Sequence, residues 1–357
     1  MNLDMADFSL DKRARAFCAA NKPIRPSEVM IGNGQYIADI AKSLINIDAE
    51  EERYVSVEYR ILDIKPHVDT LKAAWDHLGR PLEKKSGEVL AFNLLFVEFL
   101  SDLALFQAKP DEDCCVYILS KYSRLLASTR DPNAARFYNW LCSQYENRPD
   151  LDSSPYLSRA GTGSVFILMH EWLHGQQEVL GDTLALLLSS EKSRVLCQQL
   201  SPKATVELCC DYSALAMIST FEFERFFQCT KTELFGIAML ALFVPGLYAF
   251  LDNILINNQT YNWDRLAQAL FDTANERIKT LAVAVKLSCN GNLFFGDCDA
   301  DAALHYALEP IDDFLKECSS VYINRLEAKI AQFNSLSEEE REKNTFPYQY
   351  YEWGLFS

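Results

Sequence analysis

The stretch VFILMHEWLH, residues 165–174, joins an apolar run to two histidines four positions apart. Four residues advance an α-helix by slightly more than one turn, so His170 and His174 project from the same face. Glu171 follows the first histidine directly. Because the residues ahead of the pair are apolar, the pattern predicts a buried helix that offers two imidazoles on one side.

Two imidazoles one turn apart can occupy adjacent corners of a tetrahedral zinc site. A carboxylate beside the first of them can accept a proton from a water molecule at the metal and later donate it to a leaving amine. His170, Glu171 and His174 match the H-E-x-x-H motif of zinc peptidases. The chain has five histidines in all, so chance seldom produces this arrangement.

A second helix is predicted to begin at 201–202, with a serine cap and a proline in its first turn. It carries Glu207 and Asp211 at i and i+4, which places them on one face. Their neighbours are mostly apolar, and buried carboxylates require a cation or a hydrogen-bond donor. Catalytic zinc commonly binds two histidines and one glutamate and leaves the fourth position to water.

We therefore expect one Zn²⁺ ion held by His170, His174 and Glu207, with Glu171 as the general base. A histidine ligand usually donates its second ring proton to a carboxylate, and Asp211 is expected to fill that role. The adjacent Cys209 and Cys210 point about 100° apart on a helix, so the sequence favours core positions for them over metal binding.

H-E-x-x-H followed by E-x-x-x-D, here residues 207–211, resembles the gluzincin class of metallopeptidases. The small and apolar residues 212–216 are similar to those that follow this ligand in HtpX-like and Lit-type intracellular peptidases. The resemblance covers residues 165–216. It implies the same three zinc ligands, the same base and Asp211 as the partner of a ligand.

The resemblance also implies a residue that stabilises the oxyanion, because gluzincins usually add a His, Tyr or Arg for this purpose. Candidates are Tyr212, Tyr261, Arg265 and His305. HtpX-like enzymes have a His-Pro-Pro element before an arginine, and 261–265 has the arginine without the His and Pro. A structural role is the alternative for His305.

The organisation of the chain predicts a mainly α, α+β protein. Residues 54–62 alternate as a strand does, 89–106 and 132–145 read as helices, and 147–163 is rich in turn formers. We expect an N-terminal α+β region at 1–150, for substrate binding or regulation, and a helical zinc metallopeptidase core at 151–357. Within that core, a turn is expected at 181–182 and helices at 202–227, 263–285 and 311–332. The fold expected is a zincin-like helical core with a small sheet in the N-terminal part.

The composition of the chain argues against nucleic acid as a partner. The chain has 34 Lys and Arg against 50 Asp and Glu, a net charge of −16, which repels nucleic acid. Eleven cysteines without a C-x-x-C pair indicate a reducing compartment, and the N-terminus lacks the pattern of a signal peptide, so we expect a cytoplasmic protein.

Residues 234–251 have no charged side chain and raise the alternative of membrane association. Pro245 and Gly246 interrupt them, which favours short buried helices over a membrane span.

These observations predict a zinc-dependent endopeptidase that hydrolyses a peptide bond of a protein or peptide substrate. One alternative is a binding or regulatory protein with a structural or vestigial zinc, for which a closed four-ligand site is typical. Another is a helical interaction protein without metal. Neither the substrate sequence nor the oligomeric state follows from the chain.

Overall fold

The computed structural model describes residues 28–45, 54–58, 89–128, 151–220, 229–244, 247, 263–288, 295–296, 298–320, 335 and 337. Their elements are α2 (Glu28–Ile45), β1 (Tyr54–Glu58), β2 (Val89–Asn93), α4 (Leu94–Ala108), α5 (Glu112–Ser128), the short 3₁₀ helix η1 (Ser154–Tyr156), α7 (Leu157–Leu173), α8 (Gln177–Ser189), α9 (Glu191–Gln198), α10 (Pro202–Thr220), α12 (Lys231–Ala241), α14 (Trp263–Ser288) and α15 (Ala300–Ser319). The mainly helical class that the sequence predicts is confirmed.

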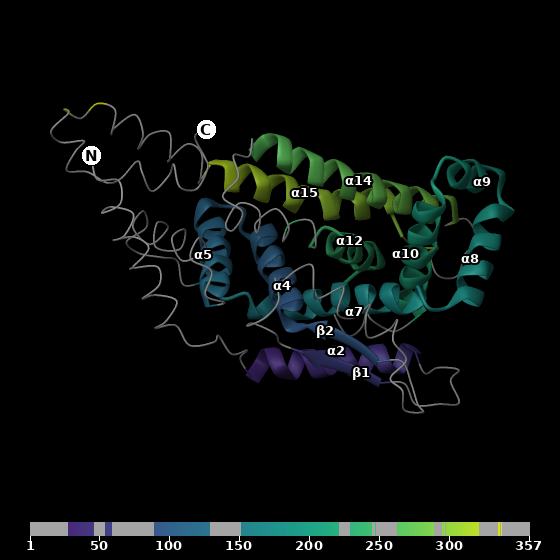
Figure 1. Ribbon diagram of the computed structural model, residues 1–357, viewed down its shortest axis with the longest axis horizontal. Coiled ribbons are helices and arrows are strands. Elements are labelled where there is room, and N and C mark those ends of the chain that lie inside the picture. The colour runs from purple at the N-terminus through teal and green to yellow at the C-terminus, as the bar shows by residue number, and fades with distance from the viewer. Residues whose placement is uncertain are drawn as a thin grey trace, which may run out of the picture.

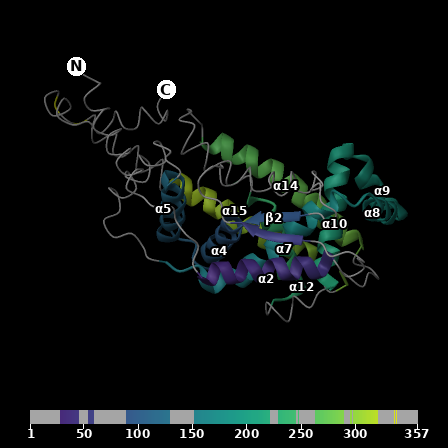
Figure 2. The same cartoon turned by 60° about the horizontal axis from the view of Figure 1, so that its bottom comes forward.

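The helices are stacked in layers, as Figure 1 shows. α14 and α15 lie side by side on one side, α12 lies beneath them, and α7 runs below α12. The outer layer on the far side of α7 contains α2 and the two strands, and in Figure 2 the strands lie above α2. α8 and α9 extend from one end of the stack, beside α10. This arrangement surrounds α7, the helix of the H-E-x-x-H motif, with other elements.

The two strands pair in parallel, with Tyr54 opposite Val89 and Glu58 opposite Asn93. The prediction of one helix over 89–106 is therefore wrong at its start, because the helix begins at Leu94. A short apolar run suits a buried strand and a buried helix equally, and pairing with β1 decides between them here. Of the strand predicted at 54–62, residues 59–62 lie outside the described part.

Gly163 lies inside α7, although the sequence places it in the stretch 147–163 that is rich in turn formers. A Cβ on Gly163 would lie 3.0 Å from Leu100 Cδ1 of α4 and 3.2 Å from Ala241 Cβ of α12. The absence of a side chain at Gly163 therefore allows three helices to approach one another closely. In the sequence alone, a glycine at this position resembles a loop signal.

The core is one apolar cluster that draws on α2, α4 and α5 as well as on the helices after 150. Phe106 of α4 contacts Phe314 of α15 edge to face, with 5.3 Å between ring centroids. α7 contributes Phe166 and neighbours on both sides of it. The N-terminal elements thus help to fix the helix that carries the histidines.

α12 begins with a capping box, in which Thr230 and Glu233 exchange hydrogen bonds. All its residues from Leu234 to Ala241 are buried, which confirms the prediction of a core helix for this part of 234–251. The structure describes 234–244 and 247 of that stretch. Among the described helices, none combines the length and the apolarity that crossing a membrane requires.

Other boundaries differ from the predicted ones. Gly181 and Asp182 lie within α8 and do not form a turn. α15 begins at Ala300, where Asp299 accepts hydrogen bonds from the first turn, and it continues through Pro310, after which the sequence places the helix start. The α14 prediction is confirmed, with the helix extending to Ser288. The helix expected at 132–145 and the ends of those expected at 202–227 and 311–332 lie outside the described residues.

Candidate metal centre

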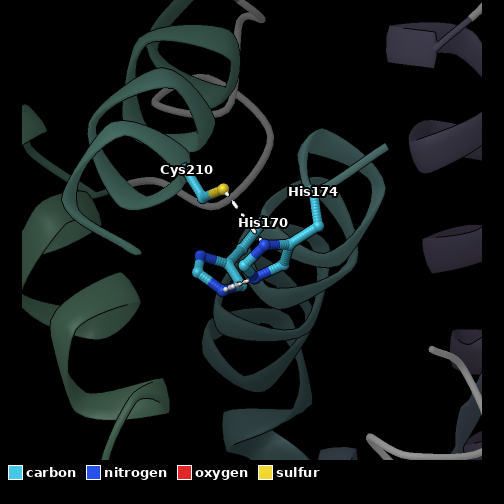
Figure 3. A group of neighbouring side chains, drawn as sticks. All are labelled: His170, His174 and Cys210. Carbon is cyan, nitrogen blue, oxygen red and sulfur yellow. Dashed lines mark hydrogen bonds between the residues drawn. The ribbon is translucent and has the colours of Figure 1, made fainter. Parts of the chain in front are cut away.

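The end of α7 brings the two histidines of the motif together. His170 is in the last turn and His174 caps the helix. Their Nε2 atoms lie 3.1 Å apart, and the rings meet edge to face. Figure 3 shows the two rings converging on a common point. A helix C-terminus also favours a positive charge, because its last carbonyls carry negative partial charge.

Glu207 of α10 faces the same two nitrogens. Its Oε2 lies 3.4 Å from Nε2 of His170, and its Oε1 lies 3.7 Å from Nε2 of His174. A tetrahedral zinc ion with bonds of about 2.0–2.1 Å separates its ligand atoms by about 3.3 Å. The Nε2–Nε2 distance of 3.1 Å is close to that value, and the carboxylate of Glu207 places a different oxygen 3.4 and 3.7 Å from the two nitrogens, so these three side chains could surround a zinc ion.

Asp211 binds the opposite nitrogen of His170. Its Oδ1 accepts the Nδ1–H of His170 at 2.8 Å, and the carboxylate is completely buried. This bond fixes the tautomer whose Nε2 has a free lone pair for a metal ion. The sequence predicts that Asp211 accepts a hydrogen bond from a histidine ligand, and the structure brings Asp211 and His170 together.

Burial opposes a charge on His170, but the charge of Asp211 and the hydrogen bonds to Asp211 and Glu207 together outweigh burial and raise the pKa of His170 to about 9. Burial would also raise the pKa of Asp211, yet the charges of the neighbouring Arg277 and of His170 hold that pKa at about 2. The pKa of His174 is lowered, first by burial and then by the charge of His170. In the metal-free protein at neutral pH, His170 is therefore protonated, with Nδ1–H donated to Asp211 and Nε2–H facing Glu207, and His174 is neutral.

Glu171 is half-buried, and burial raises the pKa of its carboxyl group above the usual range. The charge of His170 acts on Glu171, and the charge of Glu171 acts on Cys210 and Arg277, so the carboxyl group is within electrostatic range of the site. A carboxylate with a raised pKa is a stronger base, which suits the proton transfer expected of Glu171.

Cys209 and Cys210 are both buried in the core, as predicted, but Cys210 is also a second candidate for the third ligand, which the sequence did not favour. Its Sγ lies 3.6 Å from Nδ1 of His174, and Figure 3 marks this contact with a dashed line. His170, His174 and Cys210 form a group whose donor atoms lie within 4.8 Å of one another. Glu207 and Cys210 approach different nitrogens of His174, so the ring nitrogen that His174 uses decides between them.

Arg277 of α14 completes the site and is absent from the sequence predictions. Its Nε and Nη2 donate to the two oxygens of Asp211 at 2.8 and 2.9 Å, and Nη2 lies 3.1 Å from Oε2 of Glu207. Nη2 also lies 3.2 Å from Nε2 of His170. The sequence does carry a signal for Arg277. Ala274, Arg277 and Leu281 have the spacing of one helix face, and Arg277 is a charged residue between two apolar ones on that face.

Among the predicted oxyanion donors whose side chains the structure describes, neither Tyr212 nor His305 is brought to the site. Tyr212 is buried in the core against Phe295. His305 is exposed on α15, 3.6 Å from Glu309. Arg265 precedes Arg277 by twelve residues, roughly 18 Å along α14. Tyr261 lies outside the described residues.

No protein-family model, curated protein or solved structure matches the chain. The gluzincin resemblance therefore rests on the residues of the two sequence motifs alone.

Proposed function

We propose that the chain is a zinc-dependent endopeptidase that hydrolyses a peptide bond of a protein or peptide substrate. The proposal is supported by the Nε2 atoms of His170 and His174, which lie 3.1 Å apart, and by the carboxylate of Glu207, which places one oxygen near each of them at 3.4 and 3.7 Å. Two histidines and one glutamate leave a fourth position open, as catalytic zinc sites do.

A bound zinc ion supplies the Lewis acidity that activates water and polarises a carbonyl group. The protein's residues provide the proton transfers and the orientation. Glu171 accepts the proton of the attacking water and donates it to the leaving amine, as its raised pKa allows. Asp211 holds His170 in one tautomer through the bond of 2.8 Å.

An extended substrate requires a strand with which to pair. The sequence offers 54–62 for that role, and its described part, β1, pairs with β2 and contacts α2. β2 is the described strand that contacts α7. The proposal therefore includes this sheet as the wall along which a peptide binds.

Metal analysis with a base-deleted variant tests the function. Glu171→Gln should keep about one zinc per chain and lose about 10²-fold or more of the cleavage rate. Because the substrate is unidentified, new protein termini would be mapped across a proteome after expression of each form. Glu178→Gln, which alters an exposed glutamate of α8, is the matched control and should cleave as the unmodified chain does. New termini that persist in Glu171→Gln would contradict the mechanism.

A second function, a binding or regulatory protein with a structural zinc, is favoured by Cys210. A tetrahedral ion separates a sulfur and a nitrogen ligand by about 3.6 Å, and the Cys210 Sγ to His174 Nδ1 distance is 3.6 Å. Cobalt substitution separates the two functions, because a thiolate ligand gives charge-transfer absorption in the near ultraviolet. If that band appears, and Cys210→Ser removes it while Cys209→Ser does not, the structural role is supported.

A further inference from the structure

The guanidinium group of Arg277 has more hydrogen-bond donors than its described partners use. Arginine has five N–H groups. The Nε–H and one Nη2–H bind Asp211, and Nη2 also lies 3.1 Å from Oε2 of Glu207 and 3.2 Å from Nε2 of His170. Within the described ranges, the two N–H groups of Nη1 have no acceptor among the contacts of this residue.

Nη1 is bonded to the same carbon as Nη2, which lies 3.2 Å from the Nε2 atom of His170. The free donors are therefore next to the atoms that would hold a metal ion. The side chain of Arg277 is 34% exposed, whereas that of its partner Asp211 is 1% exposed. One edge of the guanidinium plane is thus fixed in the protein, and the side chain still reaches solvent.

A fixed donor at this place is what an oxyanion requires. Donors held in position before the reaction stabilise the charge that develops on a carbonyl oxygen, and they do so most strongly where water is excluded. Guanidinium remains charged at all working pH values. None of the described sequence candidates for this role reaches the site, whereas Arg277 is already part of it.

We propose that Nη1 of Arg277 is the hydrogen-bond donor to the carbonyl oxygen of the bound peptide and to the oxyanion formed from it. The inference rests on the proposed function, because it presupposes a metal ion held by His170, His174 and Glu207. It makes Arg277 a catalytic residue in addition to a partner of Asp211.

Phosphate binding to the cobalt-loaded full chain tests this without a known substrate. Inorganic phosphate offers oxygens that mimic an oxyanion, and the visible spectrum of cobalt reports its arrival at the metal. Arg277→Lys retains the positive charge and removes the Nη1 donors. We expect it to bind about one cobalt per chain and to bind phosphate roughly tenfold more weakly or worse.

Arg277→Gln provides a second variant, and it should weaken phosphate binding at least as much. Lys279→Gln, which neutralises an exposed lysine of the same helix, is the control and should leave phosphate affinity unchanged. Unaltered phosphate affinity in a cobalt-loaded Arg277→Lys protein would overturn the inference and leave the metal site standing.

Two other outcomes have separate meanings. Loss of cobalt from both Arg277 variants would overturn the donor role, because it would mean that the arginine acts by positioning Glu207 and Asp211. Failure of the unmodified chain to bind cobalt would overturn the proposed function itself, and the donor role with it.

Discussion

At the scale of single residues, His170 has two nitrogens with different partners. Nδ1 donates to Asp211, and Nε2 faces Glu207 and the Nε2 of His174. In the metal-free protein the carboxylates hold a proton on this ring, which is why its pKa is raised to about 9. A metal ion and that proton compete for the same lone pair.

Zinc binding should therefore release a proton. Below pH 9 the proton on His170 must be displaced, so apparent zinc affinity is expected to rise about tenfold per pH unit from pH 7 to 9 and to level off above. His174, with its lowered pKa, adds no proton in this range. Calorimetry in buffers of different ionisation enthalpy would count the protons, and a pH-independent affinity between 7 and 9 would contradict the prediction.

Asp211→Asn should weaken zinc binding by about 10- to 100-fold, since partners of metal ligands contribute that much to affinity. It should also lower the pKa of His170, so the rise of zinc affinity with pH should end at a lower pH. The matched control is Asp182→Asn on the exposed surface of α8. Competition with a chelator across a pH series measures both effects. Equal zinc affinities in the two variants would refute a role for Asp211.

At the scale of elements, close helix approaches determine how α7 and α12 are placed. Gly236 of α12 lies against the ring of Tyr306 of α15, and a Cβ there would lie 2.6 Å from Cδ1 of Tyr306. Gly163 does the same for α7 against α4 and α12. The histidines depend on this packing, because they project from the end of α7.

Gly236→Ala should destabilise the protein by about 1–3 kcal/mol, because the added methyl group overpacks the α12–α15 contact. Gly181→Ala in α8 is the matched control, since a Cβ at Gly181 meets nothing within 4 Å. It should stabilise the protein by about 0.5–1 kcal/mol, because alanine loses less backbone entropy in a helix. Urea unfolding of the two variants gives the comparison, and shifts of the same sign and size would contradict it.

At the scale of the whole molecule, the site joins three helices that are distant in the sequence. α7 supplies the histidines, α10 supplies Glu207 and Asp211, and α14 supplies Arg277. A metal ion bound here links α7 to α10 only in the folded protein. Metal binding is therefore coupled to global stability.

Zinc should raise the melting temperature of the full chain, and a free concentration of 100 times the dissociation constant corresponds to about 2.7 kcal/mol. Glu171→Gln should show the full increase, because Glu171 is not a ligand. His174→Ala should lose most of it. Thermal unfolding with and without a chelator measures the effect. An increase in His174→Ala equal to that of the unmodified chain would contradict the assignment of the ligands.

The sequence predicts that His170, His174, Glu207 and Asp211 come together in pairs, because helical periodicity fixes which residues share a face. His170 and His174 share one turn, as do Glu207 and Asp211, and carboxylates with apolar neighbours require a cation or a hydrogen-bond donor. Arg277 lies 66 residues beyond Asp211. Periodicity within one helix does not determine which other helix packs against that helix, so the contact of Arg277 with Asp211 follows only from the tertiary fold.

Two helices were predicted with wrong boundaries because glycine is also a common turn residue. Gly163 lies in a helix, where it allows close packing, and Gly181 lies in a helix that tolerates it. β2 has no alternation of polar residues and was read as part of α4. The exchange of hydrogen bonds with β1, which is not encoded in the five residues of β2, determines its conformation.

X-ray absorption at the zinc edge of the loaded chain would show whether His170, His174 and Glu207 form the metal centre. We expect nitrogen and oxygen neighbours at about 2.0–2.1 Å and no sulfur neighbour. A sulfur shell at about 2.3 Å, or a chain that retains no zinc, would contradict it.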